Sequence, residues 1–131
     1  MIRAQERQDG RDAFQRETLL ALQDAVEDTR QIAFREYERK LAVLRRERRW
    51  EDHPPGDPLP KDWSDADAQV NKLWARVFDA DLQSMVADFQ TAAGDAITAQ
   101  TQERAFDEVN HLSRLAHQVN SRIGELLPEL V

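Results

Sequence analysis

The chain of 131 residues has a mass of 15.2 kDa and a formal net charge of −7, and its length suits one domain. It contains 4 Gly, 5 Pro, 5 Phe and 1 Tyr. Strand-rich folds need many turn, β-branched and aromatic residues, so these counts disfavour them. The absence of Cys excludes disulfides, thiolate nucleophiles and Cys-ligated metal sites. We therefore expect a single all-α domain that is stabilised by packing alone.

The start of the chain and its hydropathy predict where in the cell the protein resides. The first residues are polar and lack the apolar segment of a secretory signal. No apolar run approaches the roughly 18 residues that a membrane span requires. We therefore expect a cytoplasmic protein with no membrane partner.

Charge is divided unevenly along the chain. Residues 1–50 contain 12 Lys and Arg against 10 Asp and Glu, whereas residues 51–131 contain 6 against 15. This change of sign favours charge pairing within the protein. We expect the basic end of the first helix to lie beside acidic residues of the next helix, namely Asp65, Asp67, Asp79 and Asp81.

The densest basic stretch could contact phosphates of a nucleic acid, with the neighbouring Trp50 stacking on a base. Glu47 lies within this stretch, however, and the pI is near 4.9. Cations at the carboxyl end of a helix are also favoured by the helix dipole. We therefore do not expect a nucleic-acid partner for the four arginines Arg45, Arg46, Arg48 and Arg49.

The first half of the chain predicts a disordered segment followed by a long helix. Residues 1–11 show no apolar period and include a glycine, which indicates a disordered lead-in. Apolar residues then recur every three or four positions, so we expect a helix over about residues 12–50, with Asp12 as its N-cap. Residues 51–63 contain four prolines and one glycine and must form a loop.

The second half predicts a helix or a pair of helices over about residues 64–127, with Ser64 as the N-cap. One continuous helix would form a long antiparallel, coiled-coil-like hairpin with the first helix. A turn in the polar window 94–104 would instead give an up-down-up bundle of three helices. We prefer the hairpin, because the apolar stripe runs on without a proline until Pro128.

The stripe in the last part of the chain also predicts self-association. Its apolar face is longer than one short helix can cover, so a second copy would bury the remainder. We expect a homodimer or a higher oligomer whose interface includes Phe106, Val109, Leu112, Val119 and Ile123.

Three tryptophans flank the proline-rich loop. Trp50 and Trp63 are candidates for an aromatic interface at the tip of the hairpin, because Trp side chains often anchor protein interfaces. The alternative is that they cover the end of the core. For Trp74 we prefer a place in the core, beside Val70 and Val77.

The sequence Glu108-x-x-His111 resembles the Glu-x-x-His motif of ferritin-like di-iron proteins, where a carboxylate and an imidazole one turn apart hold the same metal. Such a site needs two of these motifs and two further glutamates. The resemblance therefore implies a metal site only in a dimer, with Glu17, Glu27 or Glu36 of the first helix as the bridging ligand.

The segment 116–121 resembles the phosphorylatable histidine motif of histidine phosphotransfer domains, which are helical bundles of similar length. That motif has an apolar residue two positions after the histidine, then usually Lys and Gly. Val119 keeps the apolar place, whereas Asn120 replaces the Lys and Ser121 replaces the Gly. The resemblance implies a bundle that carries a phosphoryl group on His117.

No catalytic motif occurs in the chain. The serines lie outside any strand-turn-helix elbow, and the four glycines are scattered rather than gathered in a phosphate-binding loop. We expect no enzymatic activity and no cofactor. The favoured function is a non-enzymatic, oligomeric helical scaffold or adaptor that binds a protein partner.

Overall fold

A computed structural model describes residues 2–52 and 59–130. Within these ranges the chain forms helices and no strand, which confirms the all-α prediction. The elements are α1 (Ile2–Glu47), α2 (Lys61–Trp74), α3 (Ala80–Ile97), α4 (Gln102–Leu126) and the short 3₁₀ helix η1 (Leu127–Leu130). No helix of the described residues has the length and apolar character needed to cross a membrane.

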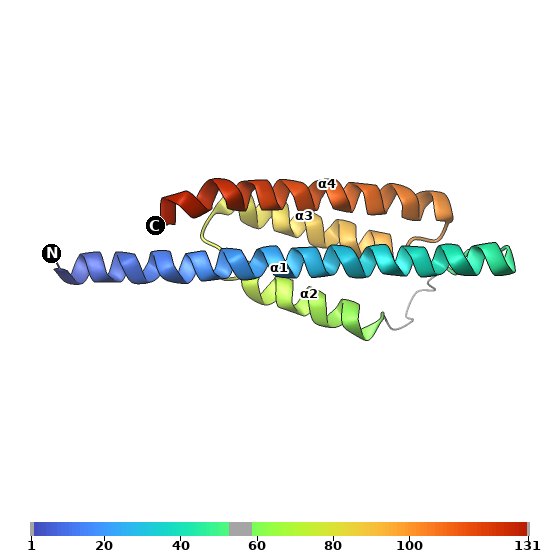
Figure 1. Cartoon of the computed structure of the whole chain (residues 1–131), viewed down its shortest axis with the longest axis horizontal. Helices are drawn as coiled ribbons and strands as arrows, with labels where there is room; N and C mark the ends of the chain where they lie inside the picture. The colour runs from blue at the N-terminus through green and yellow to red at the C-terminus, as the bar shows by residue number, and fades with distance from the viewer. Residues whose placement is uncertain (1, 53–58, 131) are drawn as a thin grey trace.

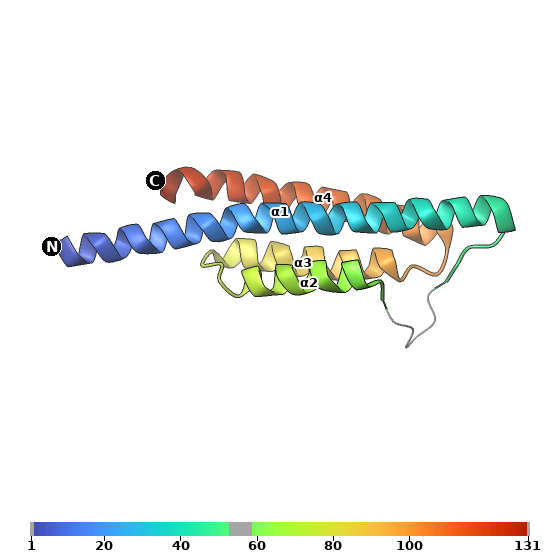
Figure 2. The same ribbon diagram turned by 60° about the horizontal axis from the view of Figure 1, so that its bottom comes forward.

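The four α-helices run alternately up and down, each antiparallel to the next (Figures 1 and 2). α3 and α4 pack against each other along the most extensive interface, and α1 packs against α2, α3 and α4. The preferred prediction of one helix over residues 64–127 is therefore wrong. The three-helix alternative placed a turn correctly in the window 94–104, but the chain also turns at residues 75–79.

The turn between α2 and α3 contains no glycine and no proline, and it is held by polar side chains. The Asp79 carboxylate caps α3 by accepting a hydrogen bond from the Leu82 N–H at 2.9 Å. From α1, the Gln15 side chain accepts from the Phe78 N–H at 2.8 Å and donates to the Arg76 carbonyl at 3.0 Å. A residue far away in sequence therefore satisfies the backbone of this turn.

The turn between α3 and α4 is held from both sides. Thr101 caps α4, its hydroxyl accepting from the Arg104 N–H at 3.2 Å. The Lys40 ammonium donates to the Ile97 carbonyl at 2.9 Å, and the Trp50 Nε1–H donates to the Ala99 carbonyl at 3.1 Å. The first contact satisfies a carbonyl group that the end of α3 leaves without a helical partner, and the second satisfies a carbonyl group of the turn itself.

α1 begins at Ile2, so the prediction of a disordered lead-in over residues 1–11 is wrong for residues 2–11. Once packing has ordered the central part of a helix, each further residue adds a hydrogen bond without a new nucleus. Gly10 costs such an extension only about 1 kcal/mol. Asp12 consequently lies inside the helix and is not its N-cap.

The bounds around the proline-rich loop also differ from those predicted. α1 ends at Glu47, and Arg48 has a positive φ of 57°. α2 begins at Lys61 after Pro60, so Ser64 lies within its first turn and is not the N-cap. Within the predicted loop, residues 53–58 lie outside the described residues.

The core lies between α1, α3 and α4 and extends to α2. Each helix contributes a stripe of apolar side chains at helical spacing, which is the pattern that predicted an all-α chain. The largest fully buried side chains include Leu19, Leu22, Val70, Leu82, Phe89, Leu112 and Ile123.

Candidate functional site

Most residues of the predicted oligomer interface lie in the core of the single chain. Val109, Leu112, Val119 and Ile123 are all buried, and Ile123 has no exposed surface. The turn at residues 75–79 is the reason, because it lets α3 pack along α4 and cover the stripe within one molecule. The predicted interface is therefore wrong for these four residues. Phe106 alone of the set is exposed, at 54%.

The tryptophans do not form an exposed aromatic surface. Trp63 is buried in α2. Trp50 is half-buried, its ring 6.1 Å from that of Tyr37 and 5.9 Å from the Lys40 ammonium. Trp50 and Trp63 therefore cover the core, in line with the alternative interpretation of the sequence. Trp74 is 36% exposed, and its Nε1–H donates to the Gln83 carbonyl at 2.8 Å, so its place is at the edge of the core.

Glu108 and His111 lie one turn apart on α4, but no other side chain of the described residues completes a metal site with them. Glu108 is paired with Arg104 at 3.2 Å, and His111 is exposed. Nowhere in residues 2–52 and 59–130 do three metal-binding side chains gather.

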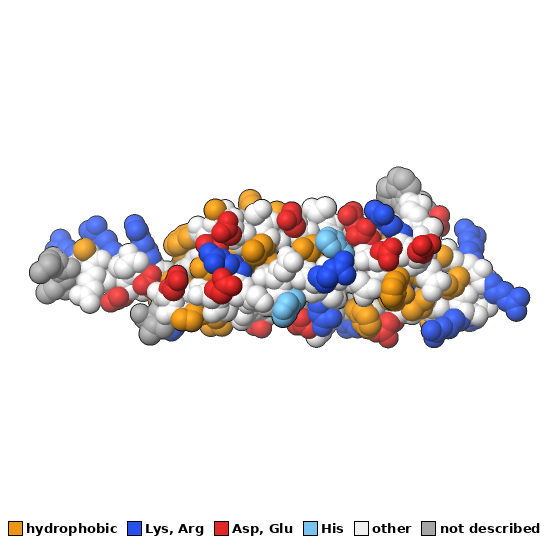
Figure 3. Space-filling view, turned by 90° about the horizontal axis from the view of Figure 1, so that it is seen from above, with side chains coloured by type: hydrophobic (Ala, Val, Ile, Leu, Met, Phe, Trp, Pro, Cys, Tyr) orange, Lys and Arg blue, Asp and Glu red, His pale blue; other side chains and the backbone are white. Residues whose placement is uncertain are grey.

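His117 is exposed on α4. The face of the molecule in Figure 3 shows histidine side chains among intermingled acidic and basic ones. A polar hollow of about 270 Å³ beside it is lined in part by Glu27, Arg30 and Asn120. Arg30 donates to Glu27 at 3.0 Å, and this pairing holds the pKa of the Glu27 carboxyl below its usual value. A phosphoryl group on His117 would thus meet an ionised carboxylate and a guanidinium that is already engaged.

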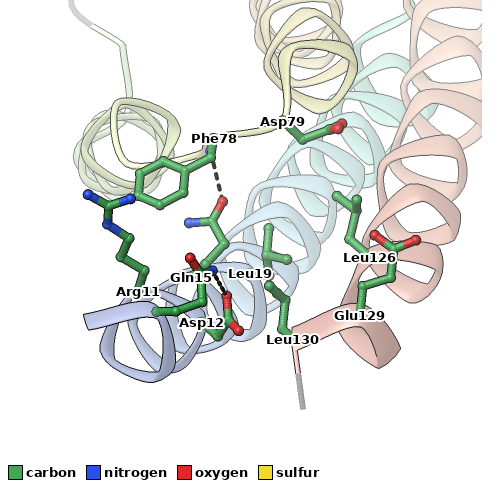
Figure 4. A pocket seen from close by; sticks show the side chains of 10 residues that line it. Arg11, Asp12, Gln15, Leu19, Phe78, Asp79, Leu126, Glu129 and Leu130 are labelled. Atoms are coloured by element: carbon green, nitrogen blue, oxygen red, sulfur yellow. Dashed lines mark hydrogen bonds between the residues drawn. The ribbon is translucent and has the colours of Figure 1, made fainter. Parts of the chain in front are cut away.

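A groove of about 580 Å³ lies where α3 begins and α4 ends against α1 (Figure 4). Side chains from three separate segments line it. Its apolar residues are Leu19, Phe78, Leu126 and Leu130, and its polar residues are Gln8, Arg11, Asp12, Gln15, Asp79 and Glu129.

The groove exists because α1 is longer than its neighbours. The N-terminal end of α1 projects past the start of α3 and the end of α4 (Figures 1 and 2). We call this part, residues 3–11, the overhang; all its side chains are exposed. The face of α1 that packs in the bundle therefore continues into the overhang with no helix above it.

Two aromatic rings stand beside the groove. Phe78, in the turn between α2 and α3, is 65% exposed, and Phe14 of α1 is 42% exposed. Their ring centroids are 6.3 Å apart, within the range of favourable aromatic pairs. The Gln15 hydrogen bond to the Phe78 N–H fixes the backbone that carries the more exposed ring.

An ion pair fixes the wall of the groove. The Arg122 guanidinium of α4 donates to both carboxylate oxygens of Asp79, at 2.9 and 3.1 Å. These hydrogen bonds hold the pKa of Asp79 below its ordinary value of 3.8. The prediction that Asp79 pairs with the basic end of the first helix is therefore wrong.

Sequence reasoning missed the groove, although a signal was present. Gln15 and Thr18 are polar residues at core positions of α1, where the apolar period predicts apolar side chains, and both are buried. A polar residue on a core stripe indicates a backbone group that it must satisfy.

Comparison with protein-family models, with characterised proteins and with solved structures finds no match to this chain.

Proposed function

We propose that the chain is a non-enzymatic helical module that binds a partner protein in the groove at the base of the overhang. The observation that carries this proposal is the juxtaposition of a hollow of about 580 Å³ with the exposed Phe78 ring. Large aromatic side chains in such positions are typical centres of protein interfaces.

The lining of the groove favours a protein partner. Apolar side chains line it together with polar and charged ones, and protein interfaces likewise combine apolar contacts with polar ones. The groove also opens along the uncovered face of α1. A helical segment of the partner could lie on that face, with one or two apolar side chains in the groove.

The rigidity of the turn between α2 and α3 supports the same function. The Gln15 hydrogen bonds and the Arg122–Asp79 ion pair hold the turn before docking, so binding would cost little ordering entropy there. An enzymatic function has no comparable support, since the groove combines no nucleophile with a general base.

Co-purification with two matched variants tests the proposal. Phe78→Ser removes the groove's aromatic ring, and Phe106→Ser removes another exposed ring near the start of α4, at the far end of the bundle. We expect the tagged wild-type chain and Phe106→Ser to retain the same protein, and Phe78→Ser to lose it. Equal retention by all three chains would overturn the proposal, as would loss with Phe106→Ser alone.

A further inference from the structure

The overhang carries a row of arginines that have no acidic partner in the described part of the chain. Arg3, Arg7 and Arg11 are spaced four residues apart, so they follow one side of the helix. All three are exposed, and none of the ion pairs of the described residues includes them. Arg11, the last of the row, lines the groove (Figure 4).

This row is unfavourable for an isolated helix end. Like charges four residues apart repel by about 0.2–0.5 kcal/mol per pair. Cations near the amino end of a helix also oppose its dipole, and the first turn of α1 contains no acidic residue. Both the repulsion within the row and the opposition to the helix dipole would be relieved if negative charge covered the row.

We propose that the Arg3–Arg7–Arg11 row is the docking strip for an acidic helical segment of the partner protein. The inference rests on the proposed function, because the same segment would place its apolar side chains in the groove that Arg11 adjoins. Acidic side chains of the segment would face the arginines and the positive end of the α1 dipole.

Charge disfavours a second copy of this chain as the occupant. Two overhangs packed antiparallel about a two-fold axis place the same flank of each helix together. The arginine row of one copy would then face the arginine row of the other. An acidic segment of a different protein avoids this repulsion.

Charge reversal at the two ends of α1 tests the proposal. Arg3→Glu/Arg7→Glu reverses two arginines of the row, and Arg45→Glu/Arg46→Glu reverses two exposed arginines in the last turn of the same helix. We expect retention of the partner by the tagged chain to fall about tenfold or more with the first pair and to stay within about twofold with the second. Arg3→Lys/Arg7→Lys should keep most of the binding.

Photo-crosslinking from position 8, which lines the groove within the overhang, identifies the bound segment. We expect an acidic helical segment of another protein. The inference is overturned if the captured segment is neutral or basic, if it is a second copy of this chain, or if the charge variants bind equally. It is also overturned if the chain binds phosphatidylserine vesicles through this row and captures no protein.

The two proposals fail in different ways. If Phe78→Ser abolishes co-purification and Arg3→Glu/Arg7→Glu does not, the groove is the binding site and the acidic segment is wrong. If neither variant changes what is retained, the proposed function fails as well.

Discussion

Gln15 of α1 accepts a hydrogen bond from the Phe78 N–H at 2.8 Å, across 63 positions of sequence. The same side chain donates to the Arg76 carbonyl at 3.0 Å. One buried amide thus satisfies a donor and an acceptor of the turn that separates α2 from α3. The exposed Phe78 ring depends on this contact for its position beside the groove.

Replacing Gln15 by Leu should destabilise the bundle. Leu fills a similar volume but leaves the Phe78 N–H and the Arg76 carbonyl without their partner, at about 1 kcal/mol each. We expect urea denaturation to show a loss of about 2 kcal/mol in the free energy of unfolding. The control is Gln8→Leu, which removes an exposed hydrogen bond to Asp12 and should change stability by less than about 0.5 kcal/mol. Equal losses in the two variants would show that Gln15 does not hold the turn.

Two substitutions at Asp79 separate its cap from its ion pair. Asp79→Asn keeps an oxygen that can accept from the Leu82 N–H but loses the charge opposite Arg122. Asp79→Ala loses both, and the cap alone is worth about 1 kcal/mol. We expect Asp79→Ala to lower the thermal midpoint more than Asp79→Asn. The same midpoint for both would mean that the cap contributes nothing.

The Asp79 ion pair should also respond to acid. Arg122 lowers the pKa of Asp79 in the folded chain, so the pair contributes stability above the ordinary value of 3.8. That contribution is lost as the pH falls through the lowered pKa. We therefore expect the stability difference between wild type and Asp79→Asn to be largest near neutral pH and to shrink below about pH 4. Denaturant titrations over this range measure it, and a difference independent of pH would contradict the assignment.

The buried Lys40 should make the free energy of unfolding depend on pH in the alkaline range. Burial lowers its pKa from 10.5, although Glu36 and Glu51 favour the charged form. Between the lowered pKa and 10.5, the folded chain has released a proton that the unfolded chain still holds, so stability rises with pH. We expect the free energy of unfolding of wild type to rise across this window relative to Lys40→Met. A free energy of unfolding that falls with pH relative to Lys40→Met would contradict the lowered pKa of Lys40.

The overhang should be dispensable for folding. Because the side chains of residues 3–9 are all exposed, we expect deletion of residues 2–9 to change the free energy of unfolding by less than about 0.5 kcal/mol. The deletion should nevertheless abolish co-purification of the partner. Circular dichroism during urea titration provides the stability measurement, and a loss above about 1 kcal/mol would show that this part of α1 supports the bundle.

The fold was predictable wherever the apolar period and the turn residues agreed. The period indicated helices throughout, and the small and polar residues of the window 94–104 indicated the turn before α4. The turn before α3 could not be predicted in the same way. Its residues include Val77 and Phe78, which continue the apolar stripe, and the contacts that break the helix come from Gln15 of α1 and Arg122 of α4.

The turn at residues 75–79 also explains why the predicted oligomer interface was wrong. A continuous helix leaves the stripe through Leu112 and Val119 uncovered, which predicts an interface with another copy. In the folded chain α3 covers that stripe, and the uncovered surface moves to the turn and the overhang. Self-association stays a prediction, with Phe106 as the one member of its predicted stripe that is exposed.

Photo-crosslinking in the cells that make the protein tests the docking groove most directly. A photoreactive phenylalanine analogue is placed at position 78 or, as the matched control, at position 106, both of which carry exposed phenylalanines. We predict one crosslinked product from position 78, in which another protein is bound to this chain, and none from position 106. The absence of a product at position 78, or the same product from both positions, would contradict a partner-binding groove at the base of α1.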